Sequence, residues 1–394
     1  MNRSANDSVC REKRLLVLCA RTRTTPGISE EIRRILEGPL DWDYLFSEAA
    51  ENSITPLLDG QLRAVAPDRV PAEQRERLTA ACRANTVRNL FLTAELTKIL
   101  NVFRSRGIQA IPYKGPVLAA QAYGDLTRRE FEDLDIILRQ RDMPNAHEGM
   151  LELGYRPRFD WILSPDAAAS LVPGEYNYRD ETRRTIVELH TEITLRHFPV
   201  LPDLEELARN GVPVILSGYE VRTFSVEDGL PILCIHGSKD FWERLSWIAD
   251  ISELLQAHPS LDWNVSLRRT ESLKAERMLN LGLTLANRLL GSPLPGEIAR
   301  RITADQVAAA VATDVEHRLL SRESQPPDAA GRFHFRRRML SGTLAGWRYA
   351  MRLALVPVED DWKMMRLPRP LAPLYLAVRP LRLLRKYGWA GRRA

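Results

Sequence analysis

Features that define several protein classes are missing from this chain of 394 residues. Its four cysteines, Cys10, Cys19, Cys82 and Cys234, show neither Cys-x-x-Cys nor Cys/His metal-binding spacing. We therefore expect buried, reduced thiols rather than a disulfide framework or a structural zinc site. No apolar run reaches the roughly 18 residues of a transmembrane helix, and residues 1–7 lack a signal-peptide pattern. These absences predict a cytoplasmic protein.

Several catalytic and nucleotide-binding motifs are missing as well. The sequence contains no Walker A motif, no Rossmann glycine fingerprint and no nucleophile-elbow serine. It also lacks an internal repeat, which argues against a solenoid or a propeller. The apolar fraction of 44% is ordinary for a globular protein, and the length allows one large core or two modest ones.

Acidic residues are scarce at the end of the chain. Residues 331–394 contain 15 Lys and Arg against 3 Asp and Glu, whereas the rest of the chain has 41 against 48. The formal net charge of +5 therefore conceals a polarised molecule. Leucines and aromatic residues interleave with the arginines over residues 375–389. This pattern suits an anionic membrane surface, nucleic-acid phosphates, or a helix that packs its leucines on the core and leaves its arginines in water.

Breaks in the sequence pattern divide the chain into four regions. Residues 1–105 predict helices, and residues 106–225 hold short strands and the candidate site described below. Residues 226–330 return to helical patterns, with a linker-like Pro-Pro-Asp break near their end. Residues 331–394 form the basic amphipathic region. Short strands between helical regions predict an α+β fold.

An Asp-x-Asp pair is the most informative feature that is present. Asp133 and Asp135 lie in the run Phe131–Leu138, which favours a strand. Side chains two residues apart in a strand point to the same face, with roughly 6.5–7 Å of backbone between them. Two carboxylates held in this way can bind one or two divalent cations, and Mg²⁺ combines a few carboxylates with phosphate oxygens. The alternative is a solvated pair on an exposed strand.

The segment before this pair predicts a phosphate-binding turn. Residues 108–113 resemble a short buried strand, Lys114-Gly115 forms a turn, and Pro116 suits the first position of a helix that runs to Tyr123. A helix N-terminus attracts phosphate, and Lys114 would add a cation while Gly115 allows close approach of the backbone. The alternative is an ordinary strand–turn–helix with a surface lysine.

A third carboxylate is expected on a neighbouring strand. The alternating segment Thr185–Thr191 predicts a strand on which Glu188 and His190 share one face. We choose Glu188 as the third metal ligand, with Glu192 as the alternative on the same face. His190 either hydrogen-bonds a ligating carboxylate or is a packing residue.

The sequence allows more than one role for the basic residues around the site. Arg129, or its neighbour Arg128, either contacts phosphate through its planar fork or is solvated. His236 and Lys239 either point across the cleft or are structural, and we expect the structural role. The aromatic residues Trp242 and Trp247 are expected in the core.

A second segment shows a superficially similar spacing. His236-Gly237-Ser238 is followed by Asp250-Ile251-Ser252, but Ser252 stands where the second carboxylate would be. Apolar residues from Leu233 to Leu255 follow a helical stripe, so we predict a helix there and reject this segment as a metal site.

These residues together resemble the uncharacterised nucleotidyltransferase family of the polymerase-β-like superfamily. That family shows Lys-Gly, a helix ending in Tyr, an Arg four residues before Asp-x-Asp, and a later acidic-x-His block. In this sequence the matching positions are Lys114, Gly115, Tyr123, Arg129, Asp133, Asp135, Glu188 and His190. Segments 41–50, 233–250 and 379–384 resemble the family too. Where the wider superfamily has Gly-Ser or Gly-Gly, this chain has Lys-Gly-Pro.

The resemblance implies a fold, a chemistry and a set of ligands. The implied fold is a small mixed sheet of nucleotidyltransferase type flanked by helices. The implied reaction transfers a nucleoside monophosphate from an NTP, such as ATP, to an unidentified acceptor hydroxyl with release of pyrophosphate, using two Mg²⁺ ions. The alternative function is a non-catalytic protein that binds nucleotide, RNA or a membrane surface through residues 331–394, and thus lies peripherally at the membrane.

Overall fold

A five-stranded mixed sheet lies at the centre of the site-bearing half of the molecule. The computed structural model describes residues 10–158, 174–193, 204–322, 327–340, 343–356, 361, 364–365, 367 and 369–387. The strands, in spatial order, are β1 (Ala110–Pro112), β2 (Asp133–Leu138), β5 (Thr185–His190), β4 (Glu175–Asp180) and β3 (Arg156–Pro157). β2 and β5 pair in parallel, and the other neighbours are antiparallel. The predicted α+β fold with a small mixed sheet is confirmed.

Alternation along β2 and β5 separates a core face from a polar face. Leu134 and Ile136 of β2 and Val187 and Leu189 of β5 are almost completely buried, and they belong to one apolar cluster with residues of the long helix α5 (Ala72–Ser105). The polar residues between them point to the other face, because successive side chains of a strand alternate. Burial of the apolar face therefore fixes where the carboxylates of β2 and β5 lie.

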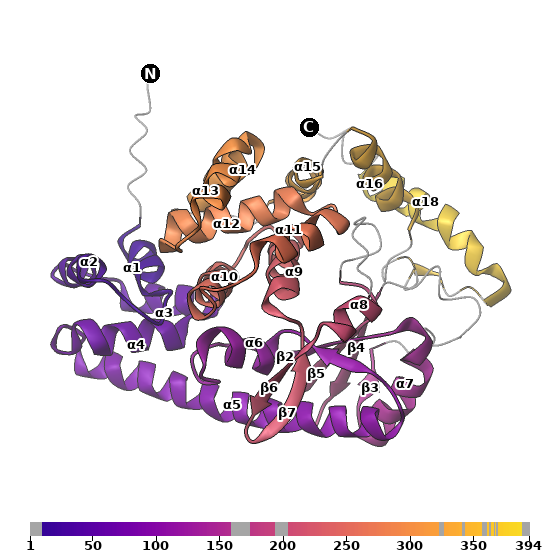
Figure 1. Cartoon of the computed structure of the whole chain (residues 1–394), viewed down its shortest axis with the longest axis horizontal. Helices are drawn as coiled ribbons and strands as arrows, with labels where there is room; N and C mark the ends of the chain where they lie inside the picture. The colour runs from indigo at the N-terminus through magenta and orange to yellow at the C-terminus, as the bar shows by residue number, and fades with distance from the viewer. Residues whose placement is uncertain are drawn as a thin grey trace.

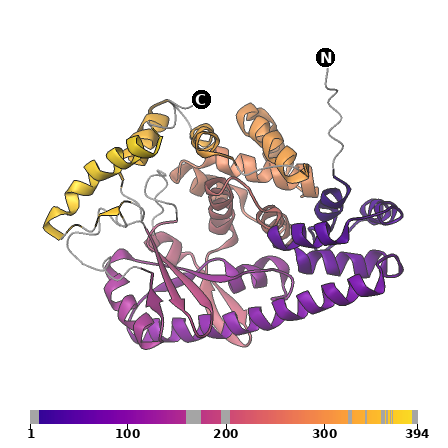
Figure 2. The same cartoon turned by 180° about the vertical axis from the view of Figure 1, so that it is seen from behind.

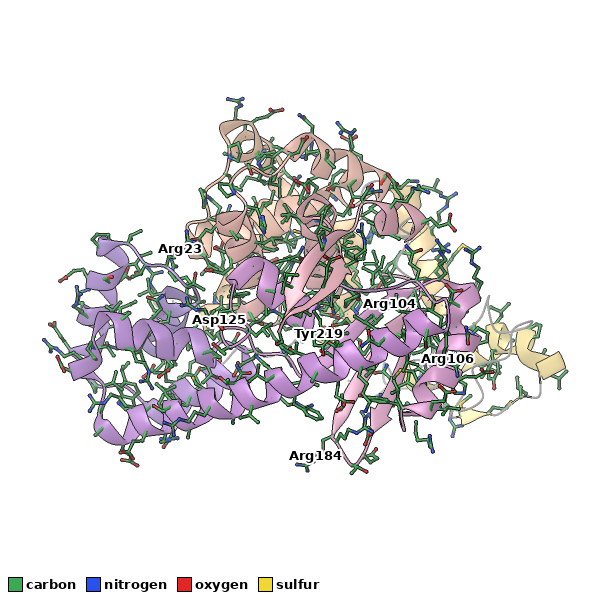
Figure 3. All side chains as sticks on the ribbon, turned by 60° about the horizontal axis from the view of Figure 1, so that its bottom comes forward. Arg23, Arg104, Arg106, Asp125, Arg184 and Tyr219 are labelled. Carbon is green, nitrogen blue, oxygen red and sulfur yellow. The ribbon has the colours of Figure 1, made fainter. Side chains whose placement is uncertain are left out.

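Helices cover the sheet from both sides. The long helix α5 runs along one side, together with α7 (Met143–Glu152), as Figures 1 and 2 show. Seen from that side, α5 lies in front of the sheet and ends near the labelled Arg104 and Arg106 (Figure 3). The short α8 (Leu204–Arg209) and the hairpin of β6 (Val212–Leu216) and β7 (Tyr219–Thr223) complete this half.

The two helical regions share an apolar core. A single cluster of buried residues includes Leu16 and Leu58 from the N-terminal helices and Leu281 and Val311 from the later ones. The N-terminal helices are α1 (Arg11–Cys19), α2 (Pro26–Leu36), α3 (Trp42–Glu51) and α4 (Thr55–Val65). The later helices are α9 (Val226–Lys239), α10 (Leu245–Ala257), α11 (Trp263–Ser272), α12 (Glu276–Leu290), α13 (Gly296–Ala304) and α14 (Gln306–Leu320). The four-region division made from the sequence remains a prediction.

The last helices lie at an outer edge of the molecule. They are α16 (Thr343–Leu355) and α18 (Tyr375–Tyr387), which pack against each other (Figure 1), whereas the preceding α15 (Ala329–Met339) packs against α9 and α14. Within the described part of the chain, no helix has the length and apolarity needed to cross a bilayer.

The helix predicted over Leu233–Leu255 is in fact two helices. α9 ends at Lys239 and α10 begins at Leu245. Phe241 and Trp242 between them have φ values of 62° and 52°, and the Trp242 amide donates to the Gly237 carbonyl at 2.8 Å. The prediction of one helix was wrong because Phe241 fits the apolar stripe, while the backbone of Phe241 and Trp242 turns the chain.

Candidate active site

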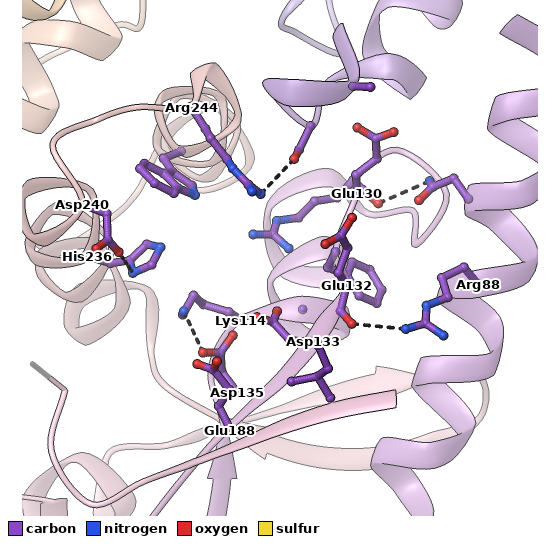
Figure 4. A pocket seen from close by; sticks show the side chains of 18 of the residues that line it. Arg88, Lys114, Glu130, Glu132, Asp133, Asp135, Glu188, His236, Asp240 and Arg244 are labelled. Carbon is purple, nitrogen blue, oxygen red and sulfur yellow. Dashed lines mark hydrogen bonds and ion pairs between the residues drawn. The ribbon is translucent and has the colours of Figure 1, made fainter. Parts of the chain in front are cut away.

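Three carboxylates converge on the polar face of the sheet. Asp135 of β2 lies opposite Glu188 of β5 in the parallel ladder, and Asp133 lies opposite Ile186. Residues paired across a ladder share a face, and so do residues two apart along a strand. Asp133, Asp135 and Glu188 therefore point the same way, into one cleft (Figure 4).

The cleft is an open cavity of about 770 Å³ between the sheet and the helices. Its floor is formed by β2, β5, the start of β4 and the turn at Lys114, and α5, α9 and α10 supply its walls. The described lining contains seven acidic and five basic residues, Glu130, Glu132, Asp133, Asp135, Glu175, Glu188, Asp240, Arg88, Lys114, Arg129, Lys239 and Arg244. An excess of acids disfavours binding of a triphosphate unless cations are bound as well.

Asp135 is the most tightly held carboxylate of the floor. Its side chain is buried, and its Oδ1 atom accepts from Lys114 Nζ at 2.7 Å and from His190 Nε2 at 3.1 Å. Burial alone would raise the pKa of Asp135, but the positive charge of Lys114 and the His190 hydrogen bond hold it well below its usual range. Asp135 is thus ionised at neutral pH. Both of these contacts are made to Oδ1 rather than to Oδ2, so a cation would approach the carboxylate from the Oδ2 side.

The same contacts keep Lys114 and His190 protonated. Burial would lower the pKa of Lys114, but the charge of Asp135 raises it well above its ordinary value. Burial likewise opposes a charge on His190, yet its hydrogen bond to Asp135 and the nearby carboxylate of Glu188 raise the pKa of the imidazole to about 9. His190 Nε2 also lies 3.6 Å from Glu188 Oε2, so the imidazole links the two strands.

Asp133 differs from Asp135 in its surroundings. Burial and the nearby charge of Asp135 raise the pKa of Asp133 to about 6, because two carboxylates on one face disfavour each other's ionisation. A divalent cation between them would remove that repulsion.

A set of potential metal ligands is preformed on this floor. One atom each from Asp135, Glu188 and His190 lie within 4.8 Å of one another, and because His190 is protonated and bonded to Asp135, the two carboxylates are the groups that could bind a cation. Asp133 is not part of this tight group, although it lines the same cleft. The oxygen-rich donor set of Asp133, Asp135 and Glu188 fits a divalent cation that prefers oxygen ligands. The alternative ligand Glu192 is not among the described residues that line the cleft, and its side chain lies against Gly174.

The Lys114-Gly115 turn holds the lysine over the floor. Gly115 has a φ of 54°, which disfavours any residue with a side chain, and a Cβ there would lie 3.4 Å from the Asp133 carbonyl oxygen. The helix that follows differs from the prediction. The α-helical part α6 covers only Gly115–Leu118 and continues as a π-helical turn over Ala119–Tyr123.

Arg129 lines the cleft, but its side chain is paired with Asp250 of α10. Its Nε and Nη2 atoms donate to the two carboxylate oxygens of Asp250 at 2.8 and 3.0 Å, and the Tyr123 hydroxyl donates to the same carboxylate at 2.8 Å. Burial would lower the pKa of Arg129, but the charge of Asp250 raises it. This buried pair ties the segment before β2 to α10, a role that the sequence did not reveal. It also accounts for Asp250, which we rejected as a metal ligand.

The helical wall carries residues that sequence reasoning did not place at the site. His236, Lys239 and Trp247 all line the cleft, although we expected structural roles for them. The His236 ring packs edge-on against Trp247, with centroids 5.1 Å apart, while Trp242 is fully buried as expected. Burial and the charges of Lys114 and Lys239 lower the pKa of His236 well below its ordinary value, so this imidazole is neutral.

Glu175 was also missed. It begins β4, lies opposite His190 in the antiparallel ladder and lines the cleft. Burial would raise its pKa, but His190 and Lys239 lower it, so Glu175 adds a further negative charge to the floor. The alternation of Glu175-Tyr176-Asn177-Tyr178, with both tyrosines buried, was an available signal for this strand.

Comparison with known proteins identifies a family. The model of a family described as uncharacterised nucleotidyltransferase matches residues 38–291. This range includes every residue of the cleft described above. No curated protein and no solved structure matches the chain.

Proposed function

Because the chain belongs to the family of uncharacterised nucleotidyltransferases, we propose that it transfers a nucleoside monophosphate from an NTP to an acceptor hydroxyl with Mg²⁺ as cofactor. The observation that carries this proposal is the cofacial set Asp133, Asp135 and Glu188 on the floor of a large open cleft. A structural carboxylate cluster has no need of such a cavity.

The excess of acids in the cleft supports metal dependence. Seven acidic and five basic side chains line it, so a triphosphate meets net repulsion there until divalent cations are bound. Bound Mg²⁺ would supply positive charge to the α-phosphate and lower the pKa of the attacking hydroxyl. Asp133 and Asp135 are the residues that would hold both ions, and Glu188 would complete the ion on the acceptor side.

The other floor residues have positioning and binding roles in this scheme. His190 donates to Asp135 and so fixes the orientation of that carboxylate. Lys114, which pairs with Asp135, would bind a phosphate oxygen of the NTP if a metal ion took over the charge of Asp135. The oxygen of the acceptor attacks the α-phosphorus, the bond to the β-phosphate breaks, and pyrophosphate leaves. The proton of the hydroxyl passes to Glu188, which lines the cleft.

The reaction is testable with labelled nucleotides. The protein is incubated with Mg²⁺, candidate acceptors and an NTP labelled at the α-phosphate or, separately, at the γ-phosphate. We expect only the α-label to enter product, and we expect Asp135→Asn to lower its rate by about 10²–10³-fold or more.

Two matched variants sharpen this test. Glu188→Gln should abolish transfer, while Glu192→Gln, four residues along the chain and away from the cleft lining, should retain it. Full transfer by Asp133→Ala/Asp135→Ala would remove these aspartates from the mechanism. Incorporation of the γ-label would replace nucleotidyl transfer with phosphoryl transfer.

A further inference from the structure

Exposed apolar side chains are concentrated at the C-terminal end of the molecule. Sixteen large apolar residues are exposed in the described part of the chain. Eleven of them lie between residues 344 and 384, namely Leu344, Trp347, Met351, Leu355, Met364, Met365, Leu371, Leu374, Leu376, Leu381 and Leu384. Exposed apolar residues scattered singly are normal, but such a concentration marks an interaction surface.

Helix α16 presents these residues on one side. Consecutive residues of a helix are rotated by about 100°, so Leu344, Trp347, Met351 and Leu355 form one stripe. We call these four residues the α16 stripe. Trp347 at its centre is 72% exposed. The exposed Arg348 flanks the stripe.

The opposite side of α16 already has its packing partners. Tyr349 is buried, and its ring stacks on Phe333 with centroids 5.7 Å apart. The helix therefore buries one face in the protein and exposes a second apolar face. A surface helix typically has one apolar face, which packs on the core. The second apolar face of α16, the α16 stripe, is therefore available to a partner.

Helix α18 repeats this arrangement. Tyr375 and Val378 are buried, whereas Leu381 and Leu384 are 64% and 65% exposed and Arg385 is exposed beside them. The buried Asp361 holds the helix in place by accepting from Arg379 at 3.1 Å and from Arg382 at 2.5 Å. This acid is thus neutralised inside the structure. Both views of the molecule place α16 and α18 at its outer edge (Figures 1 and 2).

The charge of this region selects one kind of partner. Residues 343–387, which contain α16 and α18, carry 9 basic and 3 acidic residues, and one of the acids is the buried Asp361. A second copy of the same surface would place like charges against each other, which opposes association. Nucleic acid would match the charge, but its interfaces are polar, and it would leave the exposed leucines and methionine without apolar contacts. An anionic bilayer offers both negative headgroups and an apolar interior.

We propose that α16 and α18 dock the protein on the surface of an anionic lipid bilayer, with the α16 stripe and Leu381 and Leu384 at the level of the headgroups. The arginines beside the stripes interact with lipid phosphates or carboxylates. Each basic residue near such a surface contributes about 1 kcal/mol, and the effect weakens with salt. The docking is peripheral and does not depend on the proposed transfer reaction.

The test is co-sedimentation of the full chain with lipid vesicles. One set contains equal parts of phosphatidylserine and phosphatidylcholine, and the other contains phosphatidylcholine alone. We expect binding to the first set that weakens as salt is raised, and little binding to the second. Failure to bind the anionic vesicles at low salt would overturn the proposal.

Variants locate the surface without changing its charge. Trp347→Ser/Met351→Ser should weaken vesicle binding at least tenfold, because it removes apolar contacts and no arginine. Ile215→Ser is the matched control, since Ile215 is 62% exposed on the β6–β7 hairpin, and it should bind as the unchanged protein does. If the α16 variant fails to fold by circular dichroism, Leu381→Ser/Leu384→Ser provides the same comparison on α18.

The same experiments distinguish an anionic bilayer from the other possible partners of this surface. Equal vesicle binding by variants and control would show that the stripes are not inserted, and would overturn the proposal. So would an oligomer, measured by light scattering, that only the stripe variants disrupt. Tight RNA binding lost in those variants, without vesicle binding, would assign the surface to nucleic acid instead.

Discussion

The two sides of the cleft differ in how their charged groups are held. On the sheet side, Asp135 and His190 are buried and bonded to each other, and their positions follow from the strand ladder. On the helical side, the exposed side chain of Arg244 donates a hydrogen bond of 3.2 Å to the Ser53 hydroxyl. Buried, mutually bonded groups suit chemistry that needs fixed geometry, whereas exposed ones suit binding. For the proposed reaction, we therefore expect the floor to carry catalysis and the helical wall to contribute substrate binding.

The Arg129–Asp250 pair connects the two sides, and its loss should have the largest effect. Asp250→Asn leaves the buried Arg129 without its anionic partner, so we expect a stability loss of about 3–5 kcal/mol. Thermal or urea unfolding measures it. The control is Asp314→Asn, which removes a surface pair with Arg338 and should cost at most about 1 kcal/mol. If Asp250→Asn lost no more stability than the control, the Arg129–Asp250 pair would not be important for the fold.

On the sheet side, His190 tests whether fixed geometry matters. His190→Gln should lower metal affinity or activity by about 10–100-fold, as expected for a residue that orients a metal ligand. The effect should appear in kcat rather than in the KM for NTP, because His190 acts on Asp135 and does not contact the NTP in the proposed scheme. Metal titration followed by steady-state kinetics separates the two. A change in KM alone would show that His190 contributes to substrate binding rather than to catalysis.

On the helical side, Arg244 tests recognition. Arg244→Ala should raise a KM, for NTP or for acceptor, by about tenfold and leave kcat nearly unchanged, because uniform binding is lost. The matched control is Arg104→Ala, an exposed arginine at the end of α5 (Figure 3). If Arg244→Ala lowers kcat as strongly as a floor variant does, the division between the two sides fails.

Glu130, which lines the cleft, should make the stability of the protein depend on pH. Burial raises its pKa to about 7, although its carboxylate accepts from the Thr55 amide at 3.3 Å. A carboxyl whose folded pKa is raised stabilises the protein below its unfolded pKa, and this stabilisation is lost as pH rises toward 7. Glu130→Gln should therefore stabilise the protein on the order of 1 kcal/mol at pH 8 and little at pH 4. Equal melting-temperature changes at both pH values would contradict the assignment.

The sequence was sufficient where local patterns decide the structure. Alternation predicted the strands β2 and β5, and it placed Asp133 and Asp135 on one face and Glu188 and His190 on another strand. The roles of these residues are still proposals. The strand at Glu175 had a similar signal that we did not use.

Contacts between distant segments could not be predicted in this way. Arg129 and Asp250 are 121 positions apart, and neither carries a local sign of its partner. The break between α9 and α10 was hidden because Phe241 is apolar and continues the helical stripe. The approach of His236, Lys239 and Trp247 to the floor depends on how these helices pack, which no local pattern records.

Binding of Mn²⁺, observed by electron paramagnetic resonance as a substitute for Mg²⁺, tests the central claim most directly. The unchanged protein should bind Mn²⁺, and NTP should bind tightly only in its presence. Asp135→Asn should lose both, while Glu192→Gln should keep both. Mn²⁺ and NTP binding that is the same in Asp135→Asn as in the unchanged protein would contradict the account.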